Sequence, residues 1–119
     1  MSDYVSITKS GKWVGISFNN EHDKPFAIGE KMNAINEQAY MNGYNWDALF
    51  NYYLSESAPE LLDGLESDPE AGSYAAYYEL SEENESKAIR FAEIIESLIE
   101  NEDNLYRIVR EHADEIEWD

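Results

Sequence analysis

Two segments near the N-terminus have the alternating pattern of β-strands. Residues 4–8 and 13–18 are rich in β-branched and aromatic residues. In the second segment Val14, Ile16 and Phe18 share one face, because side chains alternate sides along a strand. The residues between the segments include Gly11, which suits a tight reversal. We therefore predict a β-hairpin.

The next part of the chain has apolar residues at intervals of three and four, which is the period of a helix. This pattern predicts a helix over residues 26–42, with Asn42 and Gly43 as its stop. Asn45 is then expected to cap a second helix. A short helical turn is expected within residues 59–65.

A polar segment with glycine and proline, residues 63–72, is expected to be a loop. Residues 74–80 then predict a third strand, with Tyr77 and Glu79 on one face. The opposite face would carry Tyr74 and Tyr78, which are either core residues or part of an interface.

Two helices are predicted in the last third of the chain. Ser81 is expected to cap a long one and Asp103 a final one, and the two would form an antiparallel pair. The order of elements predicts an α+β fold, with a small, mostly antiparallel sheet of three or slightly more strands covered by about four helices. A chain of 119 residues is expected to form a single domain over residues 1–119.

The charge of the chain is strongly negative and unevenly distributed. There are 26 acidic and 8 basic residues, for a net charge of −18. Residues 1–59 hold seven acids and four bases, whereas residues 60–119 hold nineteen acids and four bases. Direct binding to nucleic acid or to an anionic membrane is disfavoured, because both are polyanions. A protein partner with a basic surface is favoured.

Features that would indicate a compartment are few. No apolar run approaches the roughly 20 residues that span a bilayer. The opening residues, from Met1 to Tyr4, lack the basic and apolar regions of a signal peptide. The chain has no cysteine, which leaves the redox compartment open. We therefore expect a cytoplasmic protein.

Catalytic motifs are sparse. His22 and His112 have no partner at metal-binding spacing, so we expect surface or structural roles for both. Residues 66–70 have an acid at every second position, as a calcium-binding loop does, but they lack the central glycine of such a loop. We expect neither an enzyme nor a bound cofactor or metal. A hydrolase with a carboxylate pair remains an alternative, as does a general acidic interaction module, such as an adaptor or a DNA mimic.

Acids and aromatic residues in the second half of the chain suit a basic partner. Tyrosine and tryptophan are enriched at interface hot spots, since they combine apolar area with a polar group. Trp118 lies between two acids and would either anchor a partner or fold back onto the core. The predicted partner-binding residues are Asp63, Glu66, Asp68, Glu70, Tyr77, Glu79 and Trp118.

Three stretches give the chain a family resemblance. They are residues 28–36 (IGEKMNAIN), residues 40–46 (YMNGYNW), and residues 68–72 (DPEAG) followed by the tyrosine strand. Together they resemble the immunity protein 51 family of bacterial polymorphic toxin systems. The resemblance implies a cytoplasmic antidote that binds and neutralises a cognate toxin, many of which are nucleases with basic clefts. It would act as a monomer or weak homodimer.

Overall fold

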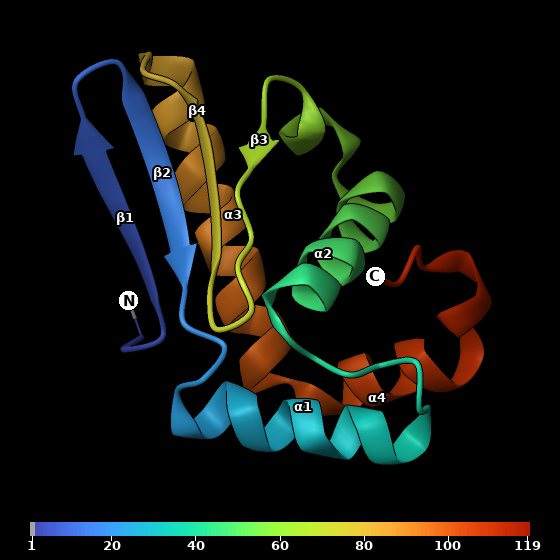
Figure 1. The fold of residues 1–119 in the computed structure, drawn as a ribbon. Helices are drawn as coiled ribbons and strands as arrows, with labels where there is room; N and C mark the ends of the chain where they lie inside the picture. The colour runs from blue at the N-terminus through green and yellow to red at the C-terminus, as the bar shows by residue number, and fades with distance from the viewer. Residues whose placement is uncertain (1) are drawn as a thin grey trace.

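Four antiparallel strands form one sheet in the order β1-β2-β4-β3 (Figure 1). β1 (Val5–Ser10) and β2 (Trp13–Phe18) make the predicted hairpin, in which Gly11 has a φ of 58°. β4 (Tyr74–Glu79) pairs with β2 and, on its other side, with the two-residue strand β3 (Glu66–Ser67). The prediction of a small antiparallel sheet slightly larger than three strands is confirmed.

One face of this sheet packs against two of the helices, residues 43–57 and 82–100. Figure 1 shows α3 (Glu82–Glu100) behind the sheet, α1 (Asp23–Ile35) and α4 (Glu102–Glu111) below it, and α2 (Gly43–Ser57) beside it, whereas no helix of residues 2–119 lies in front. The predicted α+β class is therefore confirmed. Within residues 2–119 the chain also forms the short 3₁₀ turns η1 (Pro59–Leu62) and η2 (Ala113–Glu115).

The computed structural model describes residues 2–119. Met1, the first residue of the segment considered for a signal peptide, lies outside the described residues. Over the described part of the chain, every helix is too short or too polar to cross a bilayer.

An aromatic cluster joins the inner face of the sheet to the helices. The ring of Phe50 in α2 lies 5.0 Å from Tyr74 of β4, 5.6 Å from Phe18 of β2 and 5.8 Å from Phe91 of α3, measured between centroids. Trp46 packs against Phe18 at 5.1 Å. All five side chains are buried, and edge-to-face pairs of this kind add about 0.5–1.5 kcal/mol each beyond area burial. The cluster fixes α2 and α3 against the sheet.

The boundary between α1 and α2 differs from the prediction. α1 ends at Ile35 because the side chain of Asn36 accepts a hydrogen bond from the amide of Gln38, which competes with continued helix. Asn42, expected as a stop, instead caps α2 by accepting a hydrogen bond from the amide of Asn45. The predicted cap at Asn45 is therefore wrong by one turn.

The C-terminal helices also differ from the prediction. Ser81 caps α3 as expected. Asp103, however, lies inside the first turn of α4, and Asn101 precedes that helix. Because one residue joins α3 to α4, the chain cannot reverse, and α4 lies beside α1 instead of antiparallel to α3 (Figure 1).

Candidate binding surface

The edge of the sheet at β3 brings three of the predicted site residues together. Glu66 is the cross-strand partner of Tyr77, so both side chains project from the same face. Glu66, and to a smaller extent Asp68, raises the pKa of the Tyr77 hydroxyl through its negative charge. The amide of Asp68 donates to the carbonyl of Ala75 at 2.7 Å, which holds this residue beside β4.

Glu70 and Glu79 lie at the two ends of β4. Glu70 pairs with Ser73 in an isolated bridge, in a turn that packs against the start of α2. Glu79 is the cross-strand partner of Trp13 in β2. Both acids are exposed. We call Glu66, Asp68, Glu70 and Glu79 the acidic edge.

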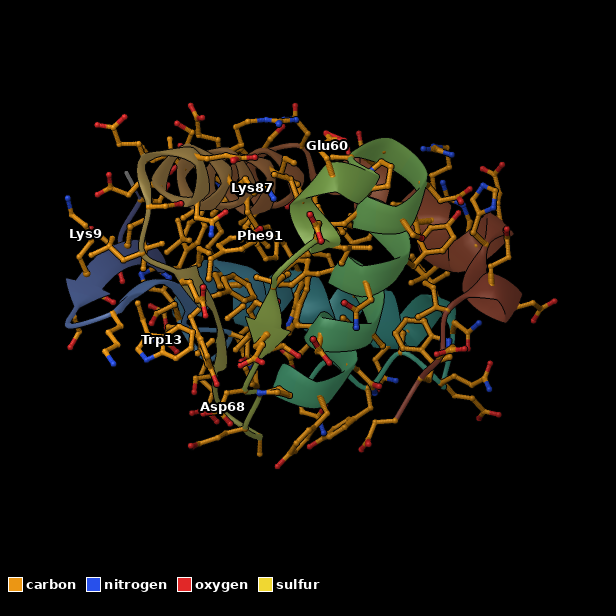
Figure 2. All side chains as sticks on the ribbon, turned by 90° about the horizontal axis from the view of Figure 1, so that it is seen from above. Lys9, Trp13, Glu60, Asp68, Lys87 and Phe91 are labelled. Atoms are coloured by element: carbon orange, nitrogen blue, oxygen red, sulfur yellow. The ribbon has the colours of Figure 1, made fainter. Side chains whose placement is uncertain are left out.

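The acidic edge is not neutralised by basic residues of the chain. Among residues 2–119, each ion pair that contains a lysine or arginine also contains a residue of α3. Figure 2 shows Lys87 on the side of α3 and Asp68 on the opposite side of the molecule. The basic residues in these pairs thus compensate acids around α3 and leave the acidic edge as a negative surface.

Asp63 does not belong to this surface. It follows η1, and Lys87 of α3 donates to its carbonyl oxygen at 3.2 Å and lies 3.9 Å from its carboxylate. The side chain of Asp63 is 92% exposed, so this pair contributes little to stability. The structure therefore separates Asp63 from the other predicted residues of its loop.

The alternative roles of Tyr74 and Tyr78 are resolved by the inner face of the sheet. Both side chains are buried, at 1% and 0% exposure. The hydroxyl of Tyr78 donates to the carbonyl of Leu61 at 2.5 Å, and burial raises its pKa to about 12. These two tyrosines are core residues, whereas Tyr77 projects outward.

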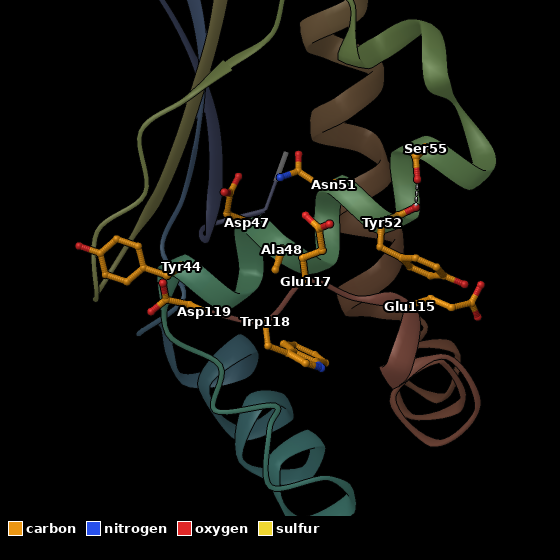
Figure 3. A pocket seen from close by; sticks show the side chains of 10 residues that line it. All are labelled: Tyr44, Asp47, Ala48, Asn51, Tyr52, Ser55, Glu115, Glu117, Trp118 and Asp119. Atoms are coloured by element: carbon orange, nitrogen blue, oxygen red, sulfur yellow. Dashed lines mark hydrogen bonds between the residues drawn. The ribbon is translucent and has the colours of Figure 1, made fainter.

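Trp118 lies on the other side of α2. Its indole nitrogen donates to the carbonyl of Ala113 at 3.2 Å, and its ring packs against the core, so the segment folds back. The segment and α2 form a groove of about 510 Å³. Figure 3 shows Asp47, Glu117 and Asp119 around this groove, with the ring of Trp118 directed away from Asp47.

Asp47 links this groove to the sheet. Burial raises the pKa of its carboxyl group, and a hydrogen bond from Ser67 of β3 opposes that rise. Its Oδ1 atom is buried without a hydrogen-bond partner in the described part of the chain. Glu117 and Asp119 add further negative charge along the same groove. The C-terminal groove is therefore a second acidic surface, separate from the acidic edge.

Both histidines have structural contacts. His22 caps α1 by accepting a hydrogen bond from the amide of Lys24. The Nδ1 atom of His112 lies 2.6 Å from the carboxylate of Glu115, and its ring stacks on Tyr52. Within residues 2–119, acids and histidines do not gather in threes with the geometry to hold a metal ion.

Trp13 is an exposed aromatic residue beside the acidic edge and lies outside the set of predicted site residues. Its side chain is 42% exposed and meets the ring of Tyr77 edge-to-face, at 5.1 Å and 74°. The signal was present in the sequence, because Trp13 is out of phase with the buried positions Val14 and Ile16. Trp13 is therefore a further candidate for the binding surface, because tryptophan is enriched at interface hot spots.

A protein-family model described as Immunity protein 51 matches residues 7–114, which is nearly the whole chain. The match includes the acidic edge, Tyr77 and Trp13. Neither the curated proteins nor the solved structures contain a significant match.

Proposed function

The chain belongs to the immunity protein 51 family, and on this premise we propose that it neutralises a bacterial toxin domain by binding it directly. The match over residues 7–114 is the observation that carries the proposal. Inhibition by binding requires a complementary surface and no catalytic group of its own. We infer that the complex forms in the cytoplasm, within a polymorphic toxin system.

The charge of the molecule supports a toxin with a basic surface. The net charge is −18, and the acidic edge has no ion pair with a lysine or arginine among the described residues. A negative field of this kind speeds the encounter with a cationic partner. Nucleases carry such cationic surfaces where they contact phosphates. We therefore infer a nuclease-type toxin whose substrate-binding cleft is covered by the acidic edge.

The test is binding and protection by a charge-reversed protein. The toxin domain encoded beside the gene is co-expressed with the wild-type chain or with a double variant, Asp68→Lys with Glu70→Lys. We expect the wild type to co-purify with the toxin and protect the cell, and the double variant to lose both properties. Loss is expected because both exposed carboxylates would be replaced by ammonium groups, which have the same sign of charge as the basic surface of the toxin.

A matched variant controls for net charge. Glu93→Lys with Glu111→Lys changes the net charge of −18 by the same amount at two exposed helix positions away from the acidic edge. This control should bind and protect as the wild type does. Equal affinity of both double variants, with the fold intact, would contradict the assignment of the acidic edge.

The C-terminal groove supports a second candidate function, hydrolysis by a carboxylate pair. Partial burial raises the pKa of the Asp47 carboxyl group, as the role of a catalytic acid requires, and Glu117 and Asp119 line the same groove. We favour binding because the family match concerns immunity proteins. Full protection by a variant with Asp47→Asn and Glu117→Gln would exclude this second candidate as the means of protection.

A further inference from the structure

The outer face of the sheet is uncovered, and its register arranges the side chains in rows. One row runs from Glu66 through Tyr77 and Gly15 to Thr8. The adjacent row runs from Glu79 to Trp13, so each row begins with a carboxylate and continues with an aromatic ring. Figure 2 shows Trp13 and Asp68 on the side of the molecule away from α3.

A groove of about 310 Å³ lies between the aromatic rings and the small residues of this face. Gly15 forms part of its floor, and Trp13 and Tyr77 form one side. The volume is at the lower end for ligand sites, which suits a side chain or a short segment of another protein. The groove exists because Gly15 has no side chain where its neighbours on β1 and β4 have theirs.

The negative charge of the outer face favours a positively charged ligand. None of the outward positions of the four described strands carries a lysine or arginine, while Glu66 and Glu79 border the aromatic pair. A cation is attracted both to carboxylates and to the face of an aromatic ring. The aliphatic stem of a lysine or arginine can lie on apolar surface at the same time.

We propose that this groove binds a basic side chain of the toxin. Its stem would lie over Gly15 and against Tyr77 and Trp13, and its charged end would extend past the two rings toward Glu66 and Glu79, which lie outside the lining of the groove. The inference rests on the proposed function and names the contact at its centre. The acidic edge would then supply attraction over a distance, and the groove would supply the close fit. Aromatic residues in a well-packed groove are where binding energy concentrates.

The first test fills the groove without disturbing the strand. In Gly15→Thr the new Cβ would lie 3.4 Å from the carbonyl oxygen of Ala76, an ordinary contact. Threonine also suits a strand better than glycine does. We expect the melting temperature to stay equal or rise, while the Kd for the toxin domain encoded beside the gene increases about tenfold or more.

The second test removes the groups that would recognise the cation. We expect Trp13→Ala to weaken binding, and Glu66→Gln with Glu79→Gln to weaken it and to reduce its dependence on salt, because two charge contacts are lost. Ile89→Ala and Glu93→Gln are the controls, since both residues are exposed on α3, away from the sheet's outer face. Both controls should keep the wild-type Kd.

The outcomes separate the groove from the function as a whole. Wild-type affinity in both Gly15→Thr and Trp13→Ala, with affinity still lost in Asp68→Lys with Glu70→Lys, would overturn the groove and leave the toxin-binding function standing. Absence of binding by the wild type would overturn both. Weaker binding by Gly15→Thr at an unchanged melting temperature, with both controls normal, would establish the groove as part of the interface.

Discussion

Tyr74 and Tyr78 are neighbours on the inner face of β4 and differ in one respect. The hydroxyl of Tyr78 donates to Leu61, whereas the buried hydroxyl of Tyr74 has no hydrogen-bond partner among the described residues. A buried hydroxyl without a partner has lost its hydrogen bonds to water and gained none in return. The two tyrosines therefore form a matched pair for measuring a single hydrogen bond.

We expect opposite results from the two Tyr→Phe variants. Tyr78→Phe should lower the free energy of unfolding by about 1–2 kcal/mol, because it leaves the carbonyl of Leu61 unpaired in the core. Tyr74→Phe should leave it unchanged or raise it, since an unpaired polar group is removed. Urea unfolding of both variants measures the difference. Equal losses would show that the Tyr74 hydroxyl has a partner after all.

Asp47 makes the stability of the folded state depend on pH, and the direction of its shifted pKa gives the sign of this dependence. Its pKa is raised by burial, so the folded state binds its proton more tightly than the unfolded state does. The associated stability is fully present below the unfolded pKa of about 3.9 and is lost as pH rises through the folded pKa. Ionised Asp47 is thus a cost at neutral pH.

The variant Asp47→Asn should therefore melt at a higher temperature than the wild type at pH 7. The gain should shrink as pH falls toward about 4, where the wild-type carboxyl becomes protonated and resembles the amide. Asp114→Asn is the control, since it removes one negative charge at an exposed position. A gain in Asp47→Asn no larger than in the control, or a gain independent of pH, would contradict this prediction.

At the scale of elements, Gly43 determines how α2 meets the sheet. A Cβ atom at this position would overlap the carbonyl oxygens of Glu70 and Ser73, and the amide of Gly43 donates to the carbonyl of Ala71 at 2.9 Å. The turn that carries Glu70 thus packs directly on the backbone of the first helical residue. Glycine is required here by the closeness of two backbones.

Replacing Gly43 by alanine should lower the free energy of unfolding by about 1–3 kcal/mol, because one of the two backbones must move. Helix propensity alone predicts the opposite sign, a gain of at most about 1 kcal/mol, because that value applies to a helix interior and Gly43 is the first residue of α2. Chemical denaturation decides between them, with Asn51→Ala in exposed mid-α2 as the control, which should be neutral or slightly stabilising. A gain for Gly43→Ala would mean that the turn is not held against α2.

The elements that the sequence predicts well are those with sustained periodicity. The hairpin, β4 and α3 have patterns long enough to define their faces, and Ser81 is a cap of the usual kind. The predicted start of α2 is wrong because Asn42 followed by Gly43 is compatible with both a helix end and a helix start. The contact with the turn at Glu70, far along the chain, decides between these readings.

Sequence patterns likewise predict only part of the candidate site. The concentration of acids in one segment is enough to single out Glu66 and Asp68, and the alternation of the following strand separates Tyr77 from Tyr74 and Tyr78. β3 cannot be predicted from the sequence, because a strand of two residues is too short to show an alternating pattern of apolar and polar positions. The outer groove required the register of three strands, which places Gly15 beside Tyr77, and no local pattern specifies that pairing.

At the scale of the whole molecule, the unbalanced charge opposes folding. A net charge of −18 on 119 residues brings like charges together in the compact state, and the ion pairs around α3 are largely exposed and therefore weak. Screening by salt should thus favour the folded state more than it weakens these pairs.

We expect the melting temperature to rise between about 0.01 M and about 0.1 M sodium chloride, over which the Debye length falls from about 30 Å to about 10 Å. The variant Asp68→Lys with Glu70→Lys should show a smaller rise, because its net charge is lower in magnitude. Thermal unfolding monitored by circular dichroism measures both. A flat or falling melting temperature in the wild type would contradict the prediction.

The three tryptophans occupy three different environments, and this gives the protein built-in optical reporters. Trp46 is buried among aromatic rings, Trp118 is half-buried beside α2, and Trp13 is exposed on the outer face. Indole fluorescence shifts to shorter wavelength as the ring leaves water. Unfolding should therefore be reported mainly by Trp46, and arrival of a partner at the groove by Trp13, so that one spectrum can separate the two events without an attached dye.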